Sequence, residues 1–282
     1  MRPLTVTGET SAAASQAARM AAIIQVEYPD LWPETVRALI VHSADWTDAM
    51  TIALSNKARR DKVNLLQCYG YGVPDLTKAM KSAANSLTLI VQDEIQPFDR
   101  FDGHFKTCDI HIHQIPWPED VLESLGETEV EMRVTLSYFI EPNPAERGWQ
   151  RKHTYHSHGL RFDVKTPSED LGQFRWRLNK AARDEEEHFK SGSDASEWIF
   201  GPQIRSRGSL HSDRWQGTAV ALAKRGYIAV YPVTGWWKER HHLGHWNKKT
   251  RYSLVVTIST PAIEVDIYTP VLNMIAVATQ IS

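Results

Sequence analysis

The first residue in the chain that could carry out chemistry is Ser11, at the head of the alanine-rich run "SAAASQAARMAA". Alanine has the highest helix propensity, so this run predicts a helix that begins at the serine. A serine in that place has two interpretations. It can cap the helix, since serine is a preferred N-cap residue. Alternatively, it can be a nucleophile whose own backbone N–H, unpaired at the helix start, faces a developing oxyanion.

Three groups of closely spaced histidines could also do chemistry, because imidazole is a zinc ligand. No cysteine or carboxylate arrangement completes a ligand set around them, so we expect no metal and no other cofactor. The groups are His111 and His113; His153, His156 and His158; and His241, His242 and His245. Trp236, Trp237 and Trp246 could stack on a sugar or a peptide, although burial in a sandwich core is the favoured interpretation.

Composition limits the classes of protein. The 282 residues are 42% hydrophobic and 23% charged, which is typical of a globular protein of one large or two ordinary domains. The net charge of -2 gives no reason to expect a nucleic-acid or membrane partner. Cys68 and Cys108 are too few for a disulfide scaffold, and residues 1–10 contain no run that resembles a signal peptide. We therefore expect a cytoplasmic protein.

The first third of the sequence predicts helices. The alanine-rich helix runs from Ser11 to about Gln25 and ends at Tyr28-Pro29-Asp30. Pro33 suits the first turn of a second helix, in which Val36, Leu39, Ile40 and Ser43 form a buried stripe. A third helix is expected from Pro74 to Ala84, after the turn Gly70-Tyr71-Gly72.

From about residue 86 the period of the pattern changes from 3.6 to 2. "EVEMRVTLSYFI" alternates apolar and polar residues, which predicts a half-buried strand. One helix-like segment runs from Pro167 to about His188. The fold class is therefore α+β, with a helical part at 1–85 and an antiparallel β-sandwich-like domain at 86–282. Further strands are expected at "LTLIVQ", "DIHIHQI", "GLRFDVK", "YIAVYPV", "RYSLVVTIS" and "EVDIYTP".

The opening stretch resembles a known family. "GETSAAASQAARMAAIIQVEYPDLWPETVRALIVHSA" is similar to the nucleophile helix and the following helix of subtilisin-like serine peptidases, or subtilases. Thr10-Ser11 match the family's Thr-Ser, and Ala13 and Ala18 occupy its small-residue positions. "YGYGVPDLTKAM" is similar to the tight turn and last helix of the same catalytic domain. Three elements in the right order are more specific than a lone Thr-Ser.

The resemblance implies a function. Residues 1–85 look like the C-terminal part of a subtilase catalytic domain, with Ser11 as nucleophile and backbone oxyanion donor in peptide-bond hydrolysis. The remainder resembles the β-rich C-terminal region of large bacterial cytoplasmic subtilases, a group in which an AAA-type ATPase is often encoded alongside. The implied partners are a polypeptide substrate and that ATPase.

The sequence also departs from the family. The triad runs Asp, His, Ser along a subtilase chain, and only ten residues precede Ser11 here. We therefore expect this chain to be inactive alone, unless an N-terminal fragment supplies the aspartate and histidine. Glu9 stands where the family has glycine, Ser15 where it has proline and Arg19 where it has a small residue. The helices up to Ala84 should expose apolar faces. The alternative is a non-catalytic interaction module from a truncated subtilase gene.

Overall fold

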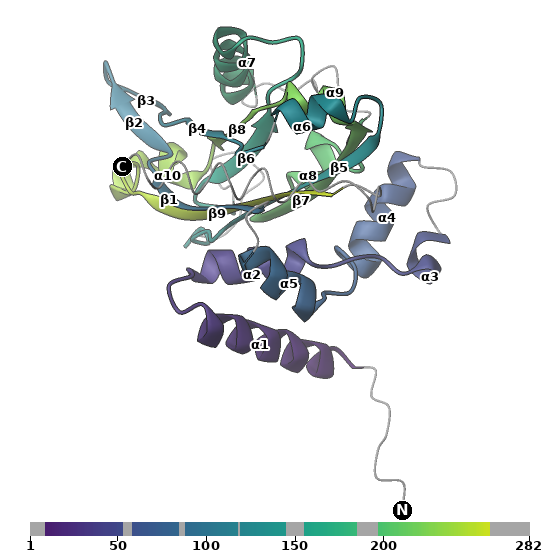
Figure 1. Cartoon of the computed structure of the whole chain (residues 1–282). Coiled ribbons are helices and arrows are strands. Elements are labelled where there is room, and N and C mark those ends of the chain that lie inside the picture. The colour runs from purple at the N-terminus through teal and green to yellow at the C-terminus, as the bar shows by residue number, and fades with distance from the viewer. Residues whose placement is uncertain are drawn as a thin grey trace, which may run out of the picture.

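A computed structural model describes residues 9–52, 58–84, 88–117, 119–144, 155–184 and 197–259 (Figure 1). It contains α-helices and antiparallel sheets, which confirms the predicted α+β class. The helices are α1 Thr10–Glu27, α2 Pro33–His42, α3 Asp48–Thr51, α4 Arg59–Tyr69, α5 Leu76–Ala84, α6 Glu119–Ser124, α7 Leu171–Asp184, α8 Pro202–Arg205, α9 Ala219–Ala223, α10 Trp236–Glu239 and the 3₁₀ turn η4 His241–Leu243. The strands are β1 Thr88–Ile95, β2 Phe98–Phe101, β3 His104–Thr107, β4 His111–Gln114, β5 Glu129–Tyr138, β6 Gly159–Val164, β7 Leu210–Thr218, β8 Tyr227–Val233 and β9 Thr250–Ser259.

Two antiparallel sheets enclose the main core. One sheet has the order β1-β9-β5-β7 and the other β4-β8-β6, while β2 and β3 form a separate hairpin. Apolar side chains from both sheets meet between them, including Val134 and Leu254 from one and Phe162 and Val230 from the other. The predicted strand "EVDIYTP" and the predicted end of the helix at His188 lie outside the described residues.

Strand β5 is more buried than its alternating pattern predicts. Arg133, Thr135 and Ser137 are buried as well as the apolar residues between them, so the half-buried expectation is wrong. The reason is that α2 packs across the outer face of the sheet. Thr135 is satisfied there by hydrogen bonds, because its Oγ1 lies 2.9 Å from His42 Nδ1 and 2.8 Å from Ser212 Oγ.

The N-terminal helices share a core with the strands. Ile24 of α1 and Val36 and Leu39 of α2 pack with Val255 of β9. Figure 1 shows the resulting layers: α1 outermost, then α2 and α5, then the two sheets, with α7 on the far side. The domain boundary that we predict near Asn85 falls among residues 85–87, which are not described.

Two arginines from the sheet hold the C-terminal end of α2. Arg133 donates to the carbonyl oxygens of Ala44 (2.7 Å) and Val41 (3.0 Å), and Arg214 donates to Ala44 (3.1 Å) and pairs with Asp45. Carbonyl groups at a helix end lack intrahelical partners, so the bonds to Ala44 satisfy an acceptor that burial would otherwise leave unpaired. The sheet thereby fixes the position of α2, which in turn supports α1.

The backbone at Gly72, just after α4, lies very close to the backbone at Asp45. Val73 N donates to Asp45 O at 2.8 Å, and a Cβ on Gly72, where φ is +98°, would collide with that same carbonyl. We expect Gly72→Ala to lower the free energy of unfolding by about 2–3 kcal/mol, because the new methyl must push apart the paired backbones of Asp45 and Val73. Urea denaturation measures this change.

The matched control is Gly244→Ala. Gly244 also has a positive φ, +73°, and lies in the left-handed region with ψ +18°, but an added Cβ there meets open space. We expect this variant to cost only the conformational free energy of an L-residue in that region, about 1 kcal/mol. Equal losses for the two variants would show that the contact with Asp45 contributes nothing.

Candidate active site at the start of the first helix

Ser11 lies in the first turn of α1 and is exposed. The helix begins at Thr10, and its N-cap is Glu9, which makes no side-chain capping bond. The interpretation of Ser11 as the N-cap is therefore wrong. Ser11 Oγ forms no hydrogen bond to another residue that the structure describes, so the hydroxyl is open to an incoming group.

The backbone around Ser11 is arranged as a helix start requires. The N–H groups of Ala12 and Ala13 both donate to the Glu9 carbonyl, at 3.1 and 3.3 Å. The Ser11 N–H precedes them and is among the first helical amides, which have no intrahelical acceptor. It lies at the end of α1 where the helix dipole is positive, which favours an anion. The Ser15 hydroxyl donates to the Ser11 carbonyl at 2.9 Å, and α1 continues through this position without a break.

An apolar groove runs along the face of α1 that carries Ser11. Its volume is about 520 Å³. Ala18 follows Ser11 by seven residues, which places the two within about 20° on the helix surface and about 10 Å apart along it. The alanines of α1 form one wall of the groove and α2 forms the other. The lining residues are Ala17, Ala18, Ala21, Ala22, Gln25, Pro33, Val36, Arg37 and Ile40.

The part of the chain that the structure describes brings no general base to Ser11. Within the described residues, no imidazole or carboxylate hydrogen-bonds its hydroxyl. His42, the first histidine in the sequence, is buried on α2, where Nε2 lies 2.8 Å from Thr257 Oγ1. Burial, together with the charge of Arg133, holds the pKa of His42 well below its usual value, so it is a neutral structural residue.

Comparison with known proteins bears on this segment. Residues 4–72 match the subtilase family model. The match includes Ser11, all of α1 and α2, and the turn through Gly72, and it supports a subtilase assignment for this part of the chain. No curated protein matches the sequence. Among solved structures, the chain is similar to the lysozyme inhibitor PliG of Aeromonas hydrophila, at 12% identity and a TM-score of 0.24, over 61% of this chain and 86% of that one. That similarity is too low to support any conclusion.

The subtilase-matched segment contains elements that our reading of the sequence missed. The short helix α3 and the longer α4 lie between α2 and the turn at Gly70. Helix α4 buries Leu65 against Phe200 and Ile204, and Trp46 packs edge-on to Phe200 with ring centroids 5.6 Å apart. The spacing of Leu65 and Leu66 with Tyr69 was the available signal for α4. These contacts tie the matched segment to α8, far along the chain.

The other candidate residues have structural positions. The described residues include no group of three or more histidine, cysteine, aspartate or glutamate side chains that could hold a metal ion. His153 lies outside them. Trp236 and Trp237 are buried, as predicted, but in a separate cluster with Phe98 and not in the main core between the sheets, and Trp246 is half-buried. No helix within the described ranges has the length and apolar character that crossing a bilayer demands.

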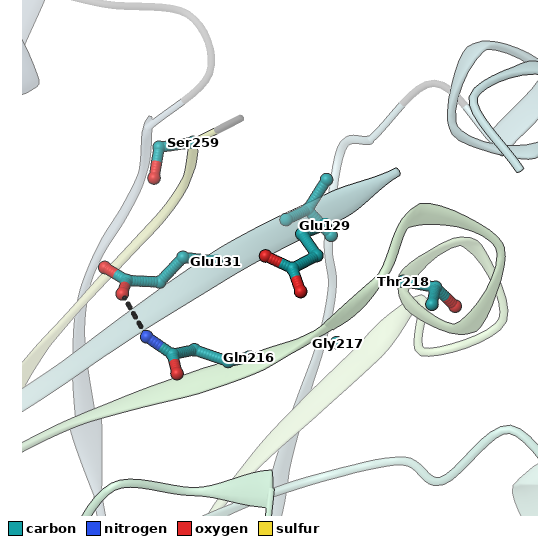
Figure 2. Close-up of a pocket in the computed structure, with 7 residues that line it drawn as sticks. Glu129, Glu131, Gln216, Gly217, Thr218 and Ser259 are labelled. Carbon is teal, nitrogen blue, oxygen red and sulfur yellow. Dashed lines mark hydrogen bonds between the residues drawn. The ribbon is translucent and has the colours of Figure 1, made fainter. Parts of the chain in front are cut away.

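A second cavity, of about 560 Å³, lies outside the subtilase-matched segment at the ends of β5, β7 and β9 (Figure 2). Glu129 and Glu131 extend from β5, and Glu131 Oε2 accepts a bond from Gln216 Nε2 at 3.1 Å. Its other oxygen lies 3.7 Å from Arg214 Nη1. Because Glu131 already has both an amide and a cation beside it, we assign no chemistry to this cavity.

Proposed function

We propose that this chain is the C-terminal part of a subtilisin-like serine endopeptidase in which Ser11 is the nucleophile. The observation that carries the proposal is the exposed serine at the positive end of α1, inside the segment that matches the subtilase family. Ser11 Oγ attacks the scissile carbonyl carbon and forms an acyl-enzyme as the amine leaves. The Ser11 N–H donates to the oxyanion of each tetrahedral intermediate, and water then releases the acid.

This mechanism requires groups that come from elsewhere. A serine hydroxyl is a weak nucleophile at neutral pH and needs a base to remove its proton. Residues 1–8, MRPLTVTG, contain neither histidine nor aspartate, and His42 is buried with both ring nitrogens occupied. The proposal is therefore that a histidine and an aspartate reach Ser11 from polypeptide outside this chain, and that this chain alone does not hydrolyse peptides.

The exposed face of α1 supports an assembly of this kind. Of the residues of α1, only Ile24 is fully buried, and Val26 has an exposed fraction of 82%. Apolar groups along α1 are therefore open to a covering element, as we expect from the sequence. A polypeptide that fills the groove at Ala18 would reach the vicinity of Ser11. A cytoplasmic location and an AAA-type ATPase partner are further parts of the proposal that rest on resemblance.

Active-site labelling tests the proposal. The chain is expressed as a fusion with the polypeptide encoded immediately upstream of Met1 in the same reading frame, and the purified protein is treated with a fluorophosphonate probe. We expect labelling at Ser11 in the fusion and none in the isolated chain, because only the fusion supplies a base. Stop codons upstream of Met1, or an unlabelled fusion, would contradict the peptidase and favour the non-catalytic interaction module.

A variant in the groove separates assembly from folding. Ala18 is exposed, so Ala18→Arg should change the free energy of unfolding of the isolated chain by less than about 0.5 kcal/mol. In the fusion it should abolish labelling, because a long cation blocks the apolar face that the added polypeptide covers. Full labelling of the Ala18→Arg fusion would show that this groove is not the contact surface.

A further inference from the structure

Four polar side chains meet between the two sheets at one corner of the molecule. Asp93 of β1 and Tyr252 of β9 are directly opposite each other in the antiparallel register. His111 and His113 are two residues apart on β4, the edge strand of the other sheet. Tyr252 Oη lies 2.9 Å from His111 Nδ1 and 2.8 Å from His113 Nε2, and His111 Nδ1 lies 3.0 Å from Asp93 Oδ2. The cluster therefore joins one sheet to the other.

One arrangement of protons satisfies all of these contacts at once. A carboxylate only accepts hydrogen bonds, so the contact with Asp93 requires a proton on His111 Nδ1. That N–H also faces the Tyr252 oxygen, which leaves the tyrosine to donate its own proton. The remaining neighbour is His113 Nε2, which can accept only when it is unprotonated. The series of contacts then runs from His113 through Tyr252 and His111 to Asp93.

We propose that these four side chains form a pH-sensitive clasp, which holds the β4 edge on the β1–β9 sheet at neutral pH and releases it when His113 takes up a proton. A proton on Nε2 places a second N–H donor against the Tyr252 oxygen, and the tyrosine O–H then loses its acceptor. It also brings a positive charge beside the imidazole of His111. The chain between β1 and β4 forms the hairpin of β2 and β3, so release of β4 loosens one end of the hairpin, which is also held by the packing of Phe98 with Trp236 and Trp237 (Figure 1).

The surroundings decide the direction of the pH effect. His113 and His111 pair with Ile228 and Val230 of β8, which are apolar. The charged groups that act on His113 are His111, from its own strand, and Asp93, from β1. Burial, assisted by His111, lowers the pKa of His113, and Asp93 opposes this shift. The unfolded chain therefore binds the proton more readily, and the clasp's contribution is present above pH 6.5 and lost as the pH falls through the His113 pKa.

Hydrogen exchange tests the clasp. In the full chain, the amides of residues 111–114 should exchange about fivefold faster at pH 5.5 than at pH 7.5 after correction for the intrinsic rate, measured relative to the amides of β5. This factor corresponds to one hydrogen bond lost between the sheets. The reference to β5 removes the general loss of stability in acid that other buried histidines cause.

Two variants make the result specific. His113→Gln keeps an acceptor that does not titrate, so its β4 amides should be protected equally at both pH values. Tyr252→Phe removes the central hydroxyl, so at both pH values its β4 amides should exchange at the faster rate that the unmodified chain shows at pH 5.5. Nitrogen-15 NMR at pH 7.5 should show the His113 proton on Nδ1. An unchanged pH dependence in His113→Gln, or a proton on Nε2 at pH 7.5, would overturn the proposal.

Discussion

Replacing Ser11 by alanine is expected to abolish peptide-bond hydrolysis by the fusion with its upstream polypeptide. The loss in kcat should be on the order of 10⁶-fold, because removing the nucleophile of a serine peptidase leaves only the catalysis that comes from substrate binding and the oxyanion donors. Ser11 is exposed and its hydroxyl makes no bond to another described residue. The free energy of unfolding should therefore change by less than about 0.5 kcal/mol. Hydrolysis of a chromogenic peptide and urea denaturation of the same preparation measure the two quantities.

Ser15→Ala is the matched control for this substitution. Ser15 lies one turn further along α1, is exposed, and donates to the Ser11 carbonyl at 2.9 Å. Losing a bond of this kind in an exposed helix should change activity by no more than about twofold. If Ser11→Ala retained hydrolysis that fluorophosphonate still inhibits, another serine would be the nucleophile. If both variants lost activity equally, the effect would be on the helix and not on the chemistry.

Local patterns in the sequence predicted most of the elements. The alanine run of α1 and the proline at the start of α2 confirm that propensity and helix-start signals are informative here. The predicted start of α7, Pro167, lies before the observed start, although the sequence carries a signal for the correct one. Asp170 and Gln173 bond reciprocally, Gln173 N to Asp170 Oδ1 at 2.7 Å and Asp170 N to Gln173 Oε1 at 3.0 Å. This is a capping box, and it fixes the first residue at Leu171.

Burial that arises from tertiary contacts could not be predicted in this way. Strand β7 was missed because its inward positions include His211 and Asp213, which break the apolar alternation of a strand. Asp213 is buried because Phe200, Gly201 and Arg205 supply donors to its carboxylate, and no alternation pattern encodes those partners. His211 is buried with Nε2 3.1 Å from the Gly208 carbonyl oxygen. The same applies to the outer face of β5. The sequence pattern predicts that Arg133 faces solvent, but α2 covers it in the folded chain.

The candidate site also has features that the sequence predicted and features that only the fold reveals. Resemblance placed Ser11 at a helix start, and the structure adds that Glu9 is the N-cap, which leaves the serine hydroxyl uncommitted. The groove along α1 could not be predicted from the alanines alone, because its second wall is α2, with Val36 and Ile40. Alternation on β4 indicated that His111 and His113 share a face. Their partner Tyr252 is more than 130 residues away, and only the folded chain brings it to them.

The largest loss of stability is expected from Asp213→Asn. Asp213 is buried on β7, where its carboxylate accepts bonds from the backbone N–H groups of Phe200 and Gly201, each at 2.9 Å, and lies 3.4 Å from Arg205 Nη1. An asparagine side chain has one acceptor oxygen, so its NH₂ group must face N–H donors. Arg205, also buried, would lose the one anionic partner that it has among the described residues. We expect the free energy of unfolding to fall by about 3–5 kcal/mol, as when one member of a buried ion pair is removed.

An exposed ion pair provides the contrast that makes this prediction specific. Arg251 Nε lies 3.2 Å from Glu94 Oε1, and both side chains are about half exposed, at 54% and 46%. Water screens such a pair, so Glu94→Gln should cost less than about 1 kcal/mol. Urea denaturation of the two variants under the same conditions measures the difference. A small loss of stability for Asp213→Asn would contradict the prediction. It would mean that the Asp213 carboxyl is protonated in the folded protein, because the amide would then replace a neutral group. In that case the loss should stay small across the neutral pH range.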